Sequence, residues 1–230
     1  MRGSWRPSRG DVTTRAAIFD FDETIIDLEP QHTAAYEALC RAMDADYASM
    51  PDSFRKSSGH RISDSVREMR AHFGWTDPEE TLFAMRQRFF DDRCASASLR
   101  VMPGVVETIH ALRELGLTLA ITSSAVRASI ETILIRLGLR DPFAVIVDGS
   151  EVVNAKPDPE AYLVTARKLG VAPAECVVLE DSHVGVVAAK RAGMFCIAVR
   201  NPRAQMRQDL SEADLIVESM SELVIVPERC

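Results

Sequence analysis

The sequence predicts an α/β protein, namely a Rossmann-like, mostly parallel sheet with an all-helical unit inserted into it. Two patterns support this prediction. From Pro103 onward, short apolar runs alternate with segments whose apolar residues recur at helical spacing, which is typical of a parallel sheet covered by helices. Between residues 29 and 98, apolar residues recur only at helical spacing, and no convincing strand interrupts them.

The first strand is expected at residues 16–20, AAIFD, because an apolar run without polar alternation is typical of a strand covered on both faces. The chain then leaves the sheet for the helical unit, whose apolar repeats predict helices around residues 36–43, 62–73 and 82–89. The predicted regions are a flexible leader (1–13), a core domain (14–28 and 99–230) and a helical domain (29–98). The leader is basic and is broken by Gly and Pro.

After Pro103 the alternation predicts five more strands and four helices. The strands are expected at residues 117–121, 143–147, 177–180, 196–199 and 214–217. The helices are expected around residues 105–112, 126–137, 158–169 and 184–192. In parallel sheets of this kind ligands collect at the carboxyl ends of the strands, so the polar residues there are the candidates for function.

Composition argues against several classes of function. The chain has 230 residues, 47% hydrophobic and 27% charged, as in an ordinary globular protein. Its formal net charge of −7 argues against a general nucleic-acid binder, and no apolar run approaches the roughly 20 residues that cross a bilayer. The five cysteines are scattered and odd in number, which favours buried thiols over disulfides. We therefore expect a cytoplasmic protein without nucleic-acid or membrane partners.

The first strand ends in a dense run of acids. AAIFDFDETIID places Asp20, Asp22, Glu23 and Asp27 within eight positions. Like charges repel, and each desolvated carboxylate costs free energy unless a cation compensates it. The rest of the chain must therefore supply a cation, or else this run is a solvated turn.

Three other predicted strands are followed by polar groups of different chemistry, namely Thr122-Ser123-Ser124, Lys156 and Glu180-Asp181-Ser182. Taken singly, each could be a turn residue, a helix cap or a loop lysine. Together they would converge on one edge of the sheet and suit phosphoryl transfer, because the transferred group carries negative charge on three oxygens. A Mg²⁺ ion between Asp20 and Asp181 would neutralise their repulsion and bind a phosphate oxygen.

The segments DFDET, ITSS, KPDP and LEDS, in this order, resemble the four motifs of the haloacid dehalogenase-like hydrolase superfamily. The inserted helices resemble the small helical cap of its beta-phosphoglucomutase and phosphatase branch. The resemblance extends over nearly the whole chain from about residue 14. Any one of the motifs alone would be a weak signal, whereas the four together are a strong one.

The resemblance implies roles for the residues of these motifs. Asp20 would be the nucleophile that takes the phosphoryl group as an aspartyl phosphate. Asp22 would protonate the leaving oxygen and then activate the water that hydrolyses this intermediate. Thr122 and the Ser123 amide would bind phosphate oxygens, and Lys156 would balance the charge.

The resemblance also implies a Mg²⁺ cofactor. Its predicted ligands are Asp20, Asp22 through its backbone carbonyl, and Asp181 with Glu180 beside it. One position departs from the family, which usually has Gly where this chain has Glu23. We expect Glu23 to alter the loop shape or add a polar contact without loss of activity.

Three residues of the helical domain are further candidates for substrate contact. In mutase members of the family a histidine at the position of His32 assists proton transfer, although a lone histidine at a helix start is commonly a surface or capping residue. The segment FRKSSGHRISDS, residues 54–65, offers Lys56 and Arg61. An ordinary solvated loop is an equally good interpretation of this segment.

These observations favour a Mg²⁺-dependent phosphatase that hydrolyses a small phosphorylated metabolite such as a sugar phosphate, and that acts as a monomer or weak homodimer. The alternative is a sugar phosphomutase of the beta-phosphoglucomutase type. Leu28 and Val126 replace polar residues that resembling mutases have, and both departures favour hydrolysis. A non-enzymatic binding protein on the same fold is less consistent, because the motif residues of an active enzyme are all present.

Overall fold

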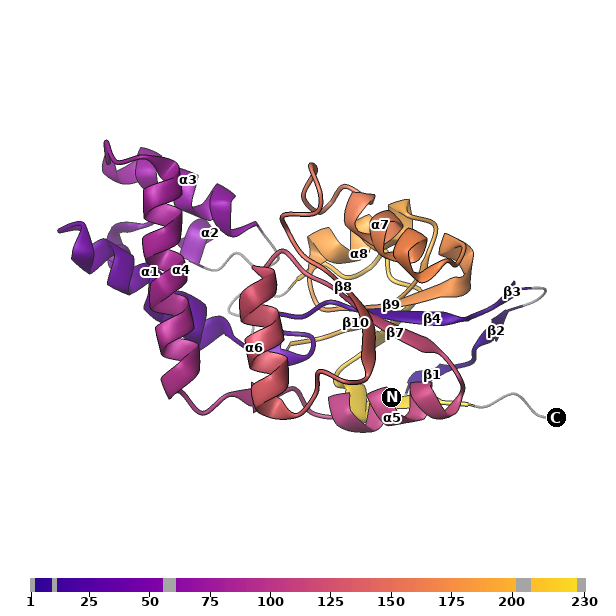
Figure 1. Ribbon diagram of the computed structural model, residues 1–230. Coiled ribbons are helices and arrows are strands. Elements are labelled where there is room, and N and C mark those ends of the chain that lie inside the picture. Colours follow the sequence, from indigo (N-terminus) through magenta and orange to yellow (C-terminus); the bar gives the residue numbers. More distant parts are fainter. Residues whose placement is uncertain (1–2, 10–11, 56–60, 202–207, 227–230) are drawn as a thin grey trace.

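The computed structural model describes residues 3–9, 12–55, 61–201 and 208–226. Its centre is a six-stranded sheet (Figure 1) made of β4 (Ala16–Phe19), β7 (Thr118–Thr122), β8 (Phe143–Val147), β9 (Cys176–Glu180), β10 (Phe195–Val199) and β11 (Leu215–Val217). The strand order is β11-β10-β9-β4-β7-β8, and all neighbours are parallel. The predicted fold class is confirmed.

Helices cover both faces of this sheet, which explains why its central strands are apolar throughout. The helices are α5 (Val105–Glu114), α6 (Arg127–Leu137), α7 (Glu160–Leu169) and α8 (His183–Arg191). Successive side chains of a strand point to opposite faces. Accordingly, Ala17 and Phe19 of β4 join the apolar cluster with α5 and α6, whereas Ala16 and Ile18 join the one with α7 and α8.

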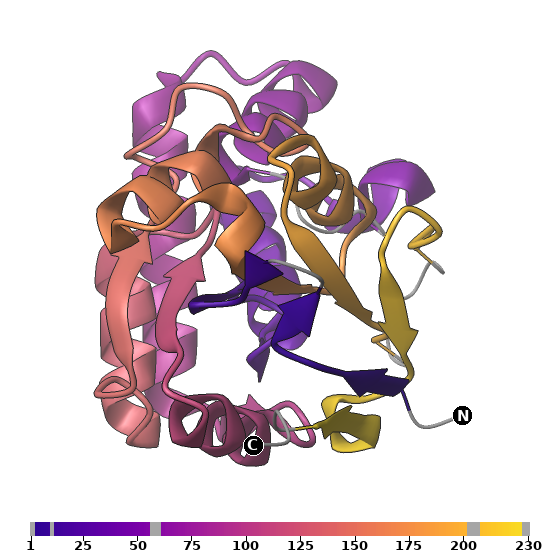
Figure 2. The same ribbon diagram turned by 90° about the vertical axis from the view of Figure 1, so that its right-hand side faces the viewer.

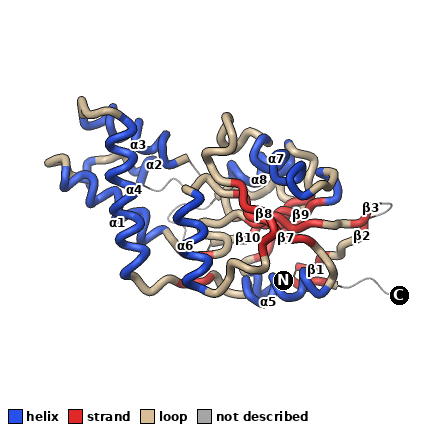
Figure 3. Tube along the Cα trace, in the orientation of Figure 1, coloured by secondary structure: helices blue, strands red, loops and turns tan. Residues whose placement is uncertain are grey.

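The helical domain lies beside the sheet (Figures 1 and 3) and contains α1 (Glu29–Ala42), α2 (Asp52–Arg55), α3 (Ile62–Phe73) and α4 (Glu79–Ser96), with a 3₁₀ turn at Tyr47–Ser49. It has its own apolar cluster, which includes Leu39, Val66 and Leu82. The two connections to the core run antiparallel as β5 (Ile26–Asp27) and β6 (Arg100–Val101). The carboxyl ends of the sheet strands therefore face the helical domain.

The amino-terminal segment differs from the flexible leader that we expected. Strand β1 (Gly3–Trp5) pairs in parallel with β12 (Leu223–Ile225), so the first and the last described strands lie side by side, at the lower edge of the view in Figure 2. The short strands β2 (Ser8–Arg9) and β3 (Val12–Thr13) pair with each other. The physical reason is the indole of Trp5, which is only 3% exposed and joins the core cluster.

Two further expectations concern the cysteines and membranes. Cys40, Cys94, Cys176 and Cys196 are buried free thiols, and Cys230 lies outside the described residues. Within the described ranges, no helix is both long and apolar enough to span a membrane. Two 3₁₀ turns, Pro173–Glu175 and Met220–Glu222, complete the structure.

Candidate active site

Side chains at or beyond the ends of strands β4, β8 and β9 meet at the edge of the sheet that faces the helical domain. Asp20 follows β4 directly, and Lys156 comes from the loop between β8 and α7. The Lys156 ammonium donates hydrogen bonds to Asp20 Oδ1 at 2.5 Å and to Glu180 Oε1 at 2.6 Å. All three side chains are buried, so these charge-assisted contacts are shielded from water.

The charges in this site do not balance. Burial opposes the charge of Lys156, yet Asp20 and Glu180 raise the pKa of Lys156 well above its usual value. Burial would raise the pKa of Glu180, but Lys156 lowers it. Burial raises the pKa of Asp20 to about 8, although the charge of Lys156 opposes this increase. Burial also raises the pKa of Asp181, and the negative charges of Glu180 and Asp20 raise it further. Lys156 and Glu180 are thus an ion pair, while Asp20 and Asp181 lack full compensation.

Glu180 does not have the free oxygens that its predicted role as a metal ligand requires. Oε1 accepts from Lys156 and from the Tyr162 hydroxyl at 2.9 Å. Oε2 accepts from the amides of Asp181 and Ser182 and from the Ser182 hydroxyl, at 2.8–3.0 Å. We therefore reassign Glu180 to the orientation of Lys156.

The close approach of Glu180 to helix α8 depends on a glycine. A Cβ added to Gly185 would lie 1.6 Å from Glu180 Oε1, which is far inside van der Waals contact. The Ser182 hydroxyl accepts a hydrogen bond from the Gly185 amide at 3.1 Å and begins the helix. The Glu180 carboxylate can therefore pack against the first turn of α8 only because residue 185 has no side chain.

The end of β7 differs from the prediction that Thr122 and the Ser123 amide bind phosphate. Thr165 donates to Ala161 O at 2.8 Å, so the hydroxyl of Thr122 donates to Thr165 Oγ1 at 2.6 Å and has no further hydrogen to give. The Ser123 amide donates to Val147 O at 3.0 Å. The Ser123 hydroxyl only accepts, from an amide at 3.0 Å, so it is the group that can still donate to a phosphate.

The residues present fit a Mg²⁺ ion. The described part of the chain contains no group of three or more His, Cys, Asp or Glu side chains placed to bind a metal. Mg²⁺, however, is commonly bound by one or two carboxylates together with water and substrate phosphate. Asp20 and Asp181 are buried acids with raised pKa values, and Thr24 orients Asp181 Oδ1 with a hydrogen bond of 3.0 Å. A divalent cation would supply the charge that these two acids lack.

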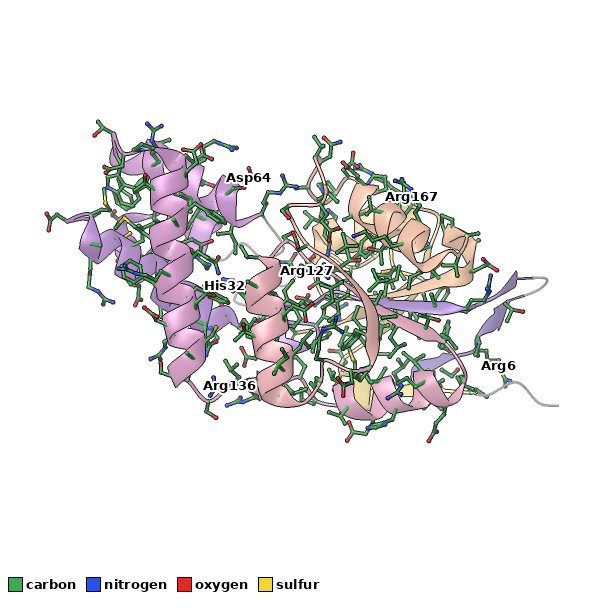
Figure 4. All side chains as sticks on the ribbon, viewed as in Figure 1. Arg6, His32, Asp64, Arg127, Arg136 and Arg167 are labelled. Carbon is green, nitrogen blue, oxygen red and sulfur yellow. The ribbon has the colours of Figure 1, made fainter. Side chains whose placement is uncertain are left out.

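His32 of α1 lies where the helical domain faces the core (Figure 4), and its Nε2 is 3.5 Å from Asp22 Oδ1. Its Nδ1 contacts a guanidinium nitrogen of Arg86, which can only donate, so Nδ1 accepts and Nε2 carries the hydrogen. Burial and the charge of Arg86 lower the pKa of His32, although Asp22 raises it. His32 is therefore a neutral imidazole whose N–H nitrogen, Nε2, lies 3.5 Å from Asp22 Oδ1, an oxygen that has no hydrogen-bond partner among the described residues.

Arg86 of α4 is a site residue that our sequence analysis missed. Its side chain is 0% exposed, and its guanidinium lies over the rings of Tyr36 at 4.4 Å and Phe90 at 5.0 Å. Its Nε and Nη1 have no hydrogen-bond partner among the described residues. A signal existed, because Arg86 lies four positions after Leu82 and four before Phe90, which places all three on the buried side of α4.

The two other candidates from the helical domain stand differently. Lys56 lies outside the described residues. Arg61 donates to the carbonyls of Val152 at 3.1 Å and Val153 at 3.3 Å, in the loop that carries Lys156. In this structure Arg61 therefore joins the helical domain to the core.

A buried lysine between two acids at the edge of a parallel sheet, with a further uncompensated acid nearby, is an arrangement suited to phosphoryl transfer. Comparison with known proteins agrees. The model of the haloacid dehalogenase-like hydrolase family matches residues 14–193, so the chain belongs to this family. The predictions of this family and of a hydrolytic enzyme are confirmed.

Individual relatives cover nearly the full chain. Hexitol phosphatase B of Escherichia coli (strain K12) is 32% identical over 90% of this chain and 93% of its own length. Beta-phosphoglucomutase of Bacillus subtilis (strain 168) is 28% identical over 92% of both chains. The crystal structure of CbbY from Rhodobacter sphaeroides in complex with phosphate has a TM-score of 0.82 at 25% identity, over 91% of this chain and 96% of CbbY.

Proposed function

We propose that this protein is a Mg²⁺-dependent phosphatase that hydrolyses a small phosphorylated metabolite, such as a sugar phosphate, through an aspartyl phosphate on Asp20. The observation that carries this proposal is the position of Lys156 between Asp20 and Glu180 at the edge of the sheet. A small substrate is consistent with a site that the helical domain covers. The similarity to hexitol phosphatase B favours a sugar phosphate among small substrates.

In the first step the Asp20 carboxylate attacks phosphorus. Lys156 binds Oδ1 of Asp20, which leaves Oδ2 for the attack. As the new bond forms, the bond from phosphorus to the leaving oxygen breaks, and protonated Asp22 gives its proton to that oxygen. The Ser123 hydroxyl and Lys156 donate hydrogen bonds to the phosphoryl oxygens, where negative charge is concentrated.

In the second step Asp22, now ionised, takes a proton from a water molecule. That water attacks phosphorus, the bond to Asp20 breaks, and inorganic phosphate leaves with Asp20 restored. The Nε2–H of neutral His32, whose nitrogen lies 3.5 Å from Asp22 Oδ1, would reach hydrogen-bond distance by a small shift and would then position this carboxyl for both proton transfers. The helical domain excludes bulk water while the intermediate exists.

Asp20, Asp181 and the backbone carbonyl of Asp22 would hold the Mg²⁺ ion. When bound, Mg²⁺ supplies positive charge that compensates the two acids and the phosphate oxygens. Ser123 and Lys156 then position the substrate phosphate, and they do not have to neutralise its negative charge by themselves.

A sugar phosphomutase is the second candidate. A mutase must bind a second phosphate in the helical domain while the substrate turns around. The similarity to beta-phosphoglucomutase of Bacillus subtilis, 28% identical over 92% of both chains, favours this possibility. Incubation with a hexose 1-phosphate distinguishes the two, because a phosphatase releases inorganic phosphate whereas a mutase yields the 6-phosphate.

The proposal is tested by Asp20→Asn. The amide retains the size of the side chain and an oxygen for Lys156, but it cannot attack phosphorus as a carboxylate does. We expect phosphate release to fall at least about a thousandfold, with the melting temperature within a few degrees of wild type. The substrates are a panel of phosphorylated metabolites and a generic ester, with Mg²⁺ present. Unchanged release from the variant would refute the assignment of the nucleophile.

A further inference from the structure

Glu23 has a backbone conformation that a glutamate rarely adopts. Its φ is 61°, in the left-handed region, and among the described residues Asp44 is the only other non-glycine with positive φ. Side chains other than Asn and Asp are disfavoured there, because Cβ approaches the backbone. Glu23 is nevertheless buried, with 8% of its surface exposed. Such strain persists only where surrounding interactions maintain it.

Three hydrogen bonds maintain Glu23 in place. Its Oε1 accepts from the amides of Leu28 at 2.7 Å and Glu29 at 2.8 Å. Its Oε2 accepts from the side-chain amide of Asn201 at 2.5 Å, in the segment that follows β10. One carboxylate therefore joins the catalytic loop, the start of the helical domain and the core.

The amides that Glu23 binds belong to the hinge, by which we mean residues 27–29, where the chain passes from the core into α1. Leu28 at the N-cap of α1 offers no capping side chain. The first amides of a helix need acceptors. Glu23, five positions before Leu28, supplies an acceptor oxygen.

The hinge also sets the position of a functional residue. His32 is one turn along α1 from Glu29, and its N–H faces Asp22, the neighbour of Glu23. An α1 that begins at a different angle would carry His32 away from Asp22. The second connection, β6, is tied separately, because the Met102 amide donates to Ile25 O at 2.9 Å.

We propose that Glu23 is a positioning residue that fixes the hinge and thereby keeps His32 at Asp22. This inference rests on the proposed function for its effect on catalysis, but the fixed hinge is a separate physical claim. A glycine at this position would relieve the strained φ and would leave the Leu28 and Glu29 amides without their acceptor.

The test compares Glu23→Gly with Glu23→Gln by amide hydrogen exchange and by kinetics. In Glu23→Gly we expect the Leu28 and Glu29 amides to exchange at least about tenfold faster, and kcat to fall about tenfold. In Glu23→Gln the side-chain oxygen still accepts both amide bonds, and the Asn201 side-chain amide turns over so that its oxygen accepts from the glutamine NH₂ group. Exchange and kcat therefore stay within about twofold of wild type. Equal losses in both variants would overturn the proposal, since the carboxylate would then act through its charge.

Asp44→Gly is the matched control. It relieves the same kind of positive φ, at an exposed residue of the helical domain, and should change neither hinge exchange nor kcat. Hinge exchange in Glu23→Gly equal to wild type would overturn the proposal outright. If wild-type protein hydrolysed none of the phosphate esters, the proposed function would fail, whereas the exchange experiment would still decide the role of Glu23 at the hinge.

Discussion

At the scale of single residues, the four buried ionisable groups of the site form two pairs, which differ in whether their charges are compensated. Lys156 and Glu180 neutralise each other, and the hydrogen bonds of Glu180 leave its oxygens no further role. Asp20 and Asp181 remain as acids whose pKa values burial raises. The first pair is therefore internally compensated, whereas the second pair lacks a compensating charge, which is why we propose that it binds Mg²⁺.

A residue-scale prediction concerns Mg²⁺. Binding to the folded state alone stabilises it, by about 2.7 kcal/mol at one hundred times the dissociation constant, so Mg²⁺ should raise the melting temperature of the wild-type protein. Metal-free Asp20 retains a proton up to about pH 8, which Mg²⁺ must displace. The increase should therefore be larger above pH 8 than at about pH 6.

The variant Asp181→Asn should lose most of this increase, because it removes one of the two carboxylates. Asp92→Asn, at an exposed position of α4, should retain it. Calorimetry with and without a chelator measures both variants. A melting temperature of wild-type protein that does not respond to Mg²⁺ at either pH would contradict the predicted metal site.

At the scale of elements, the alternation of side chains along a strand decides which residue can act. Thr122 is the last residue of β7, and its hydroxyl packs against Thr165 of α7. Ser123 is the first residue beyond the strand, and its hydroxyl retains a hydrogen. We had assigned the phosphate to both residues, because the motif ITSS alone does not reveal which side of the sheet each one faces.

An element-scale prediction concerns the contact between the end of β9 and the start of α8. Gly185→Ala places a methyl group where Glu180 Oε1 lies, so the carboxylate must move and Lys156 loses one of its two acceptors. We expect kcat to fall at least about tenfold and stability to fall by about 2–4 kcal/mol, as for a buried charge that loses its partner.

Gly116→Ala serves as the control for this prediction. Gly116 has a φ of +79°, and an added Cβ would meet no atom within 4 Å. This variant should cost about 1 kcal/mol through backbone strain and leave kcat unchanged. Equal effects of the two substitutions on kcat would show that the contact of Glu180 with α8 does not support catalysis.

At the scale of the whole molecule, contacts on two sides bring the helical domain against the core. On one side, Ser129 of α6 donates to Asp91 of α4 at 2.7 Å, and Arg136, at one end of α6 (Figure 4), donates to carbonyls at the end of α4. On the other side, Arg61 donates to the carbonyls of Val152 and Val153. This second contact holds the loop of Lys156 and the helical domain in one arrangement.

A whole-molecule prediction follows for Arg61→Ala. Without these two hydrogen bonds the helical domain should open more readily, so the radius of gyration from X-ray scattering should rise and KM should increase about fivefold. Arg70→Ala is the matched control, because Arg70 lies on α3, which begins directly after Arg61, and donates to Asp77 O within the helical domain. Unchanged scattering and KM in Arg61→Ala would contradict a role in closure.

Much of this protein could be predicted from sequence because the signals are local. The run AAIF is apolar throughout, which predicts a strand covered on both faces, and the run FAVIV fits the alternation of strands and helices. The structure places strands at both. The chain order of Asp20, Lys156 and Asp181 after such strands indicated one shared edge. The amino-terminal strands were missed, because β1 is only three residues long and is stabilised by a partner more than 200 positions away.

The sequence by itself determined the parallel sheet, the inserted helices and the acids at the strand ends, because periodicity and strand-end position are properties of neighbouring residues. Only the tertiary structure decided which acid Lys156 neutralises, which hydroxyl faces the substrate, and what Arg61, Arg86 and Glu23 contact. Those outcomes depend on groups brought together by folding, such as Lys156 and Asp20, which are 136 positions apart. Hydrogen bonds of this kind are set by distances of a few ångströms, and no pattern within one segment encodes them.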